Sequence, residues 1–382
     1  MESSFGATAP YTVGVEEEFQ LVDPGSRALS PAVDTVLAAG SGTDLITPEL
    51  SRSCVEMQSP VFGTVADLAS ELPGLRREVR RLAREGGAEL AAAGTHPFSE
   101  PTEQPLVAGD HNRRIEEEMG WLARTQAIYG LHVHVAVPDG DAAIRAVNAL
   151  ARRVPILVAL SANSPFWRGS DTGLASTRIK IFGMFPRSGL PPAFRNWQDF
   201  ERHVKILVAS GSIPDYSWCW WDARPHQKFG TVELRAPDVQ TDASHTAALV
   251  ALVQCLVANA GANGGAGAGA YAGADAGAGA GGLAPENPLF NDENKWRAVR
   301  HGMDAAFYDF AARRTVQARE MARTLVEDLR PVSQSLRCEA ELEGVLEIVD
   351  RGSGSELQRA AFEKSGSLGD VVDHLVEATA PG

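Results

Sequence analysis

The sequence has 382 residues, of which 44% are hydrophobic and 22% are charged, a composition typical of a soluble globular protein. Its formal net charge of −14 argues against a nucleic-acid backbone or an anionic membrane as partner, because both need a basic face. The four cysteines show no C-x-x-C spacing, so neither a zinc ribbon nor a disulfide framework is expected. A small anionic substrate could still bind, but only at a locally positive or metal-loaded site.

The scattered cysteines favour a reducing cytoplasm as the location, and two further features are in keeping with it. The first eleven residues contain neither a basic n-region nor an apolar h-region, so no secretory signal is expected. The longest apolar run, residues 247–258, is too short to span a bilayer and contains Gln254. This run is therefore predicted to form a buried helix.

The first two thirds of the chain alternate between strand-like and helix-like segments. Helical spacing of apolar and charged residues predicts helices at 64–93 and 109–129, and another from Asp139 to about residue 160. Residues 161–195 are dense in Ser, Gly, Pro and Arg, which predicts a long irregular segment. Long ordered loops inside compact domains usually serve a function, so this segment is expected to contribute to a site.

The last third begins with a predicted helix at 243–260. Residues 260–282 are nearly pure Gly and Ala and have few side chains that could offset the entropy of ordering, so a flexible linker or insertion is expected. Residues 291–377 are predicted to be largely helical.

Four strand-like segments share one pattern: an apolar face opposes a face that bears carboxylates or imidazoles. The polar faces carry Glu16 and Glu18 in "VGVEEEFQLV", Glu56 in "SCVEMQS", His132 and His134 in "GLHVHVAV", and Glu233 with Arg235 in "TVELRA". Glu17 falls on the apolar side of the first strand, with no lysine or arginine nearby in sequence, and is expected near a strand edge.

For any single strand, solvated glutamates on an amphipathic strand are the commoner explanation, and the "HVH" histidines alone could be structural. The combination favours a shared site, because lysine is absent from all four segments. Carboxylates crowded on neighbouring strands would have raised pKa values or would require counter-cations. Carboxylate oxygens with an occasional imidazole suit Mg²⁺ or Mn²⁺ better than zinc.

Several motifs together resemble a known family. The segments "TVGVEEEFQLVD", "ELSRSCVEMQSPV", "GTHPF", "GLHVHVAVPD", "SDTGLASTR" and "VELRAPDVQT" are similar to the bacterial carboxylate–amine ligases related to glutamate–cysteine ligase, the type 2 group. The resemblance runs in order from about residue 11 to residue 310. It implies an α+β, glutamine-synthetase-like catalytic fold, in which a curved antiparallel sheet forms a cup flanked by helices. Residues 1–382 would then form one catalytic domain.

The resemblance also implies roles for individual residues. The metal ligands would be Glu16, Glu18, Glu49, Glu56, His132 or His134, and Glu233. Glu49 is named as a ligand by the resemblance alone, because the alternation of faces along a strand (strand parity) does not select it. Arg235 and Arg178 would stabilise charge on the transferring phosphoryl group of ATP, and for Arg178 a structural salt bridge is an equal alternative.

The implied chemistry is ATP-dependent activation of a carboxylate to an acyl phosphate, followed by attack of an amine with release of ADP and phosphate. Glutamate and cysteine are the substrates that the family suggests, and activity on this pair can be weak. The chain contains no G-x-x-x-x-G-K-[ST] motif, so a Walker-type phosphate loop is excluded. The less aromatic segment 161–195 and the long Gly/Ala tract depart from the family pattern and leave the substrates open.

Two other functions are kept as alternatives. A metal-dependent hydrolase could use the H-x-H strand, although no other histidine has the spacing that would complete a zinc site. A non-catalytic homologue could retain the fold without binding ATP–Mg²⁺. ATP and amino acids are the expected partners, and a homo-oligomer is left open.

Overall fold

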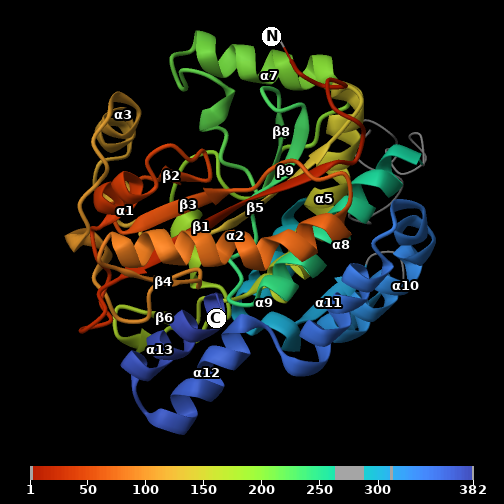
Figure 1. Ribbon diagram of the computed structural model, residues 1–382. Coiled ribbons are helices and arrows are strands. Elements are labelled where there is room, and N and C mark those ends of the chain that lie inside the picture. The colour runs from red at the N-terminus through yellow and green to blue at the C-terminus, as the bar shows by residue number, and fades with distance from the viewer. Residues whose placement is uncertain (1–2, 263–287, 310–312, 381–382) are drawn as a thin grey trace.

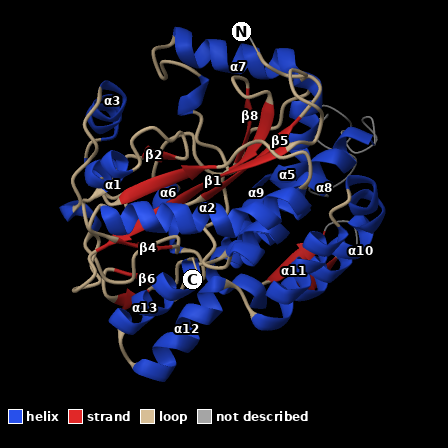
Figure 2. Cartoon of the chain, viewed as in Figure 1, coloured by secondary structure: helices blue, strands red, loops and turns tan. Residues whose placement is uncertain are grey.

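The protein is built around an antiparallel sheet of seven strands (Figures 1 and 2). The computed structural model describes residues 3–262, 288–309 and 313–380. The central strand β1 (Val13–Val22) pairs with β3 (Cys54–Gln58) on one side and with β5 (Leu131–Ala136) on the other. The strand order is β2-β3-β1-β5-β9-β8. Strands β2 (Ile46–Pro48), β8 (Ala223–His226) and β9 (Thr231–Leu234) complete this path. The seventh strand, β4 (Glu89–Ala91), pairs with the end of β1.

Helices cover the apolar face of this sheet. The long helices that pack against it include α2 (Val65–Glu85), α5 (Gly140–Ser161) and α8 (Ala243–Ala262). Side-chain caps fix where two of them begin: the Thr64 hydroxyl accepts the backbone N–H of Asp67, and the Asp139 carboxylate accepts that of Ala142. The valines and leucines of the strands and the inward faces of these helices form one continuous core.

The remaining elements surround this centre. The other helices are α1 (Val33–Ala39), α3 (Asp110–Met119), α4 (Trp121–Arg124), α6 (Thr177–Phe182), α7 (Trp197–Ala209), α9 (Pro288–His301), α10 (Ala318–Leu336), α11 (Glu339–Arg351), α12 (Gly354–Ser365) and α13 (Leu368–Thr379). Two small hairpins pair β6 (Phe166–Trp167) with β7 (Ser170–Asp171) and β10 (Ala306–Asp309) with β11 (Arg314–Gln317). Figure 1 shows α3 and α7 on one side of the sheet, and α12 and α13 at the opposite end of the molecule.

Helix α8 is a core helix, as the sequence predicts. By length and composition it could cross a membrane, but 78% of its apolar window is buried inside the protein. It packs between α5 and α11, and residues 245–258 are all buried. Its all-round apolar surface is therefore explained by contacts within the fold.

Several predicted boundaries are wrong. The helix predicted at 64–93 ends at Glu85, because the Gly86–Gly87 turn leads into β4. The helix predicted at 109–129 is divided by Gly120 into α3 and α4. Residues 161–195 are not wholly irregular, since they contain β6, β7 and α6.

The other parts of the pattern have mixed outcomes. The helix predicted at 243–260 is confirmed as α8, which extends to Ala262. Residues 263–282 of the Gly/Ala tract lie outside the described residues, so the expected flexible insertion stays a prediction. The helical character expected for 291–377 is confirmed by α9 to α13, interrupted by the hairpin of β10 and β11.

Glu17 does not lie near a sheet edge, contrary to expectation. It is a fully buried residue of the central strand, opposite Met57 and Leu131. Its partner is the guanidinium of Arg76 on α2, which donates from Nε at 2.9 Å and from Nη2 at 2.5 Å. The Thr246 hydroxyl of α8 donates a further hydrogen bond of 2.7 Å to the same carboxylate.

Arg76 also joins distant parts of the chain. Its guanidinium donates to the backbone carbonyls of Gln240, Thr241 and Thr379. One buried ion pair therefore ties β1 to α2, to the segment before α8 and to the end of α13. All donors and acceptors of the pair are occupied, which is the condition under which a buried charge pair is tolerated.

We expect Arg76→Met to destabilise the protein by about 3–5 kcal/mol, because the Glu17 carboxylate would remain buried without a counter-charge. Urea-induced unfolding followed by circular dichroism measures the change. The matched control is Arg81→Met on the same helix, whose guanidinium pairs with Glu78 and Glu85 at the exposed surface. The control should unfold like the parent, and equal unfolding midpoints for both variants would contradict the role given to Arg76.

Candidate active site

A cleft of about 460 Å³ lies over the polar face of the sheet. Strand pairing brings the polar residues together: Glu18 lies opposite Glu56, Glu16 opposite His132, and His134 opposite Glu233. Glu16, Glu18, Glu49, Glu56, His132, Arg178, Arg224, Glu233 and Arg235 are among the residues that line the cleft. The sequence pattern thus predicted a face that the structure assembles from four neighbouring strands.

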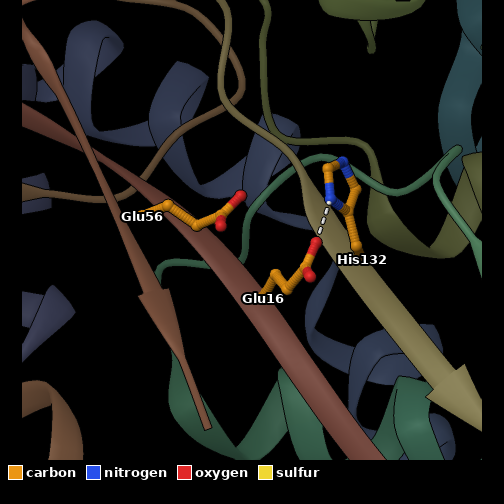
Figure 3. Close-up of side chains that lie close together, drawn as sticks. All are labelled: Glu16, Glu56 and His132. Carbon is orange, nitrogen blue, oxygen red and sulfur yellow. Dashed lines mark hydrogen bonds and ion pairs between the residues drawn. The ribbon is translucent and has the colours of Figure 1, made fainter. Parts of the chain in front are cut away.

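Glu16 lies at the middle of this face, between two histidines. Its Oε2 is 3.0 Å from Nδ1 of His132, and its Oε1 is 3.4 Å from Nε2 of His134. Figure 3 shows the Glu16 and His132 side chains in contact, with Glu56 pointing toward them from the neighbouring strand. Ligand atoms of Glu16, Glu56 and His132 lie within 4.8 Å of one another, close enough to share one metal ion.

Two more groups of the same kind adjoin the first. The second group consists of Glu16, His134 and Glu233, and the third of Glu18, Glu49 and Glu56. In each group the ligand atoms lie within the same 4.8 Å limit. The groups overlap through Glu16 and Glu56. All residues that the sequence and the family resemblance put forward as metal ligands are therefore found in one of these groups, including Glu49, which strand parity did not select.

The pKa values show where negative charge is not compensated. Burial, followed by the charge of nearby Glu18, raises the pKa of Glu49 from 4.5 to about 7. Burial, followed by the charges of Glu49 and Glu16, raises the pKa of Glu56 well above its usual range. A divalent cation among these carboxylates would supply the missing positive charge, and their oxygen donors suit Mg²⁺ or Mn²⁺.

Glu16 is in the opposite situation. Burial acts to raise its pKa, but hydrogen bonds from His132 and His134 outweigh burial and hold the pKa below its usual range. In turn, burial acts to lower the pKa of His134, whereas the hydrogen bond to Glu16 raises it overall. Glu16 is therefore an ionised carboxylate, ready to act as a ligand.

Glu233 is held by two arginines. Burial acts to raise its pKa, but the charges of Arg224 and Arg235 lower it well below its usual range. Arg224 of β8 donates from Nε to Oε2 at 2.7 Å, and Arg235 donates to Oε1. Arg224 was missed by the sequence analysis. Its position directly opposite Glu233 in the β8–β9 pair would have revealed it, had the strand at 223–226 been predicted.

Arg178 mainly contacts the backbone of the protein. Its guanidinium is buried and donates to the backbone carbonyls of Ala236 and Pro237, which follow β9. It packs so closely on Gly130 that a Cβ at this position would collide with the guanidinium. The backbone N–H of Gly130 donates to the Glu18 carboxylate. Arg178 therefore lines the cleft and also packs on the glycine that orients Glu18.

Several aromatic residues near the cleft divide between its lining and the core. His111 and Trp220 line the cleft. Trp218 and Trp221 are buried in a second apolar cluster next to the cleft, which also contains Phe185 and Phe200. His96 lies elsewhere, bonded to the carbonyl of Arg27, and exposed Trp296 contacts Lys180.

Solved structures show which fold this is. A crystal structure of glutamate–cysteine ligase from Francisella tularensis in complex with AMP matches with a TM-score of 0.67 at 12% identity, covering 98% of this chain and 90% of that one. A bifunctional glutathione synthetase from Pasteurella multocida matches with a TM-score of 0.65 at 12% identity, covering 97% of this chain and 52% of that one. The α+β, glutamine-synthetase-like fold with a curved antiparallel sheet is confirmed.

Sequence comparison gives the family. The model of glutamate–cysteine ligase family 2 matches residues 12–374, so the chain belongs to this family. A Rubrobacter xylanophilus protein provisionally named glutamate–cysteine ligase 2-3 is 57% identical over 383 residues, covering 100% of both chains. A Sorangium cellulosum protein provisionally named glutamate–cysteine ligase 2 is 37% identical over 376 residues, covering 97% of both.

The raised pKa values predict how pH and metal affect stability. An unfolded glutamate loses its proton near 4.5, whereas Glu49 in the native state loses it at about 7. Between these values the native state holds more protons, so the free energy of unfolding of metal-free protein should fall as pH rises. Mn²⁺ should therefore raise the melting temperature much more at about pH 8 than at about pH 5.5, where protons compete for the ligands.

Differential scanning fluorimetry with and without Mn²⁺ measures this effect. Glu49→Gln should reduce both the loss of metal-free stability at high pH and the gain on adding Mn²⁺. The control Glu78→Gln changes a carboxylate that pairs with Arg81 at the surface of α2, and it should behave like the parent. A Mn²⁺ effect that is independent of pH and of Glu49 would contradict the placement of the metal.

Proposed function

We propose that this protein is an ATP-dependent carboxylate–amine ligase that uses Mg²⁺ or Mn²⁺ and joins L-glutamate to L-cysteine through an acyl phosphate. The observation that carries the proposal is the set of three overlapping ligand groups along one wall of a single cleft. Family membership and the AMP complex of a protein with the same fold support nucleotide use. One catalytic domain in the cytoplasm, where ATP and reduced cysteine are both available, is part of the proposal.

The arrangement suits phosphoryl transfer. This reaction depends on positioning and charge neutralisation more than on a protein nucleophile. Bound divalent cations would neutralise the β- and γ-phosphates of ATP. Glu16, Glu18, Glu49, Glu56, His132 or His134, and Glu233 are the residues that would hold these cations.

The arginines would act on the transferred group. Arg235 is partly exposed to the cleft and is fixed by its ion pair with Glu233, so its remaining N–H groups can face a phosphoryl oxygen. Arg224 is oriented by the same carboxylate. Arg178, whose donors are directed to backbone carbonyls, would keep the end of β9 in place and so position Arg235.

The proposed reaction has two balanced steps. A carboxylate oxygen of glutamate attacks the γ-phosphorus of ATP, which breaks the bond to the bridging oxygen and releases ADP. The amine of cysteine then attacks the carbonyl carbon of the acyl phosphate and gives up one proton to water, an amide bond forms, and phosphate leaves with the electron pair of the C–O bond. An adenylating enzyme would instead release AMP and pyrophosphate.

The H-x-H hydrolase is less well supported. His132 and His134 both face the Glu16 carboxylate, and every ligand group within the described residues contains at least two carboxylates. Such oxygen-rich groups suit Mg²⁺ rather than catalytic zinc. ATP-independent hydrolysis by the purified protein would favour the hydrolase, and failure to bind ATP–Mg²⁺ would favour a non-catalytic homologue.

We expect the purified protein to release ADP only when Mg²⁺ or Mn²⁺, ATP, L-glutamate and an amine acceptor are all present. Glu16→Gln keeps the shape of the side chain but removes a ligand charge, so turnover should fall about 100-fold or more. A coupled ADP assay measures turnover, and circular dichroism verifies that the variant is folded.

Glu78→Gln is the matched control, since it makes the same change on the exposed face of α2 and should leave turnover at the parent level. A screen of single amino acids and pairs identifies the amine acceptor. Release of AMP and pyrophosphate would overturn the mechanism. Full turnover by the Glu16→Gln variant would overturn the metal site.

A further inference from the structure

Helix α3 contributes residues to the lining of the cleft but buries few side chains against the rest of the protein. Of its ten residues, only Ile115 is buried. Its ion pair between Asp110 and Arg113 is exposed, as is the pair between Glu116 and Arg124. Figure 1 shows α3 standing away from the main body, on the side of the sheet where α7 also lies. Few buried apolar contacts are the mark of a segment that opens at low cost in free energy.

Glycines flank α3 on both sides. Gly109 has φ of 154°, and Gly120 has φ of 57° with ψ of −130°, a conformation that side chains with a Cβ strongly disfavour. A Cβ at either position would meet no atom within 4 Å. The backbone conformation, and not close packing, therefore requires glycine at these two positions. This is expected for hinge positions at the ends of a helix.

The inner face of α3 is directed into the cleft. His111, Asn112 and Ile115 line it. Ile115 packs into the apolar cluster that contains Trp218 and Trp220, and the His111 ring lies edge-on to Trp218 with a centroid distance of 6.3 Å. The helix thus contacts this cluster through Ile115, the partly buried Met119 and the His111 ring.

The two edges of the cleft differ in chemistry. At the β8–β9 edge, His226 is stacked on Phe229 with centroids 4.3 Å apart, and Tyr216 and Lys228 line the same region. Flat rings beside an ammonium group suit a purine ring and phosphates. At the other edge lie Glu49, which follows β2, and Glu56, which belongs to β3.

Helix α3 is anchored at the second of these edges. The segment that precedes it is hydrogen-bonded to the segment after Glu49, from the Val107 N–H to the Leu50 carbonyl and from the Arg52 N–H to the Pro105 carbonyl. Asn112 also donates to the Val107 carbonyl. The segment that leads into α3 is therefore fixed beside Glu49, at the opposite end of the sheet from β8 and β9.

We propose that α3 is a hinged lid over the amino-acid end of the cleft and that His111 and Asn112 contact the amino-acid substrates. The proposal rests on the ligase function proposed above and adds specificity-determining residues to it. An imidazole and a carboxamide offer both donors and acceptors, as an α-carboxylate and an α-amine require. With the lid closed, water is excluded from the acyl phosphate, which would otherwise be hydrolysed.

Steady-state kinetics of His111→Ala and Asn112→Ala separate the two ends of the cleft. Loss of a substrate hydrogen bond should raise the KM for an amino acid about 10-fold, with the KM for ATP changed less than about 2-fold. Lys228→Ala is the reciprocal variant, which should raise the KM for ATP and leave the KM for amino acids near the parent value. Variants of His111 and Asn112 that leave the amino-acid KM unchanged, or that raise only the KM for ATP, would overturn the assignment.

The hinge has its own test. Gly120→Ala should lower kcat/KM for the amino acids about 10-fold, because the alanine Cβ disfavours the backbone conformation that places α3 over the cleft. The matched control is Gly87→Ala, since Gly87 has φ of 86°, leaves open space within 4 Å of where a Cβ would lie, and is outside the cleft lining. Equal losses in both variants would show that only backbone strain was measured and would overturn the hinge.

Hydrogen–deuterium exchange of the whole protein provides a readout without turnover. Addition of Mg²⁺, a non-hydrolysable ATP analogue, L-glutamate and L-cysteine should slow exchange of the amides of residues 110–119 more than the analogue and Mg²⁺ alone. Unchanged exchange in α3 in a protein that does release ADP would overturn the lid and leave the ligase function standing. Absence of ADP release by the parent protein with every amino acid would instead overturn the proposed function.

Discussion

The structure depends on how its central strand accommodates three consecutive glutamates. Alternation along β1 directs Glu16 and Glu18 into the cleft and Glu17 into the core. A carboxylate in the core of a sheet is tolerated only with a complete set of partners, and Arg76 with Thr246 supplies them. Because the same arginine holds the backbone before α8 and at the end of α13, the strand that carries the proposed metal ligands is fixed from behind.

On the cleft face the charges are compensated unevenly. Glu233 has two arginines and Glu16 has two histidines. Glu49 and Glu56 take part in no ion pair within the described part of the chain, and burial together with neighbouring carboxylates raises the pKa of both. The demand for a divalent cation is therefore greatest at the group formed by Glu18, Glu49 and Glu56, at the β2–β3 edge.

Local alternation was sufficient to predict which residues of the cleft strands share a face, because a period of two is a property of each strand alone. It could not supply partners that are distant in sequence. Arg76 lies 59 residues from Glu17, and although helical spacing places it on the apolar face of α2 with Leu72 and Val79, nothing local pairs it with Glu17. Arg224 was missed for a related reason: no strand was predicted at 223–226, so the register opposite Glu233 was not considered. Glu49 follows a three-residue strand, too short for parity, and only the family resemblance selected it.

Rigidity and mobility are distributed in a way that fits a two-step ligase. The wall with the carboxylates is built on neighbouring paired strands, and the Glu17–Arg76 pair holds the central strand from behind, so the backbone that carries the proposed ligands is well fixed. The roof is a helix with one buried residue between two glycines. A rigid wall preserves the electrostatics needed for phosphoryl transfer, since preorganised charges need not rearrange during the reaction. The proposed mobile roof would admit the amino acids and then exclude the water that would compete with the amine. If the proposed roof closes over the edge where negative charge is least compensated, the proposed cation, the activated carboxylate and the protection from hydrolysis would all be at the same place.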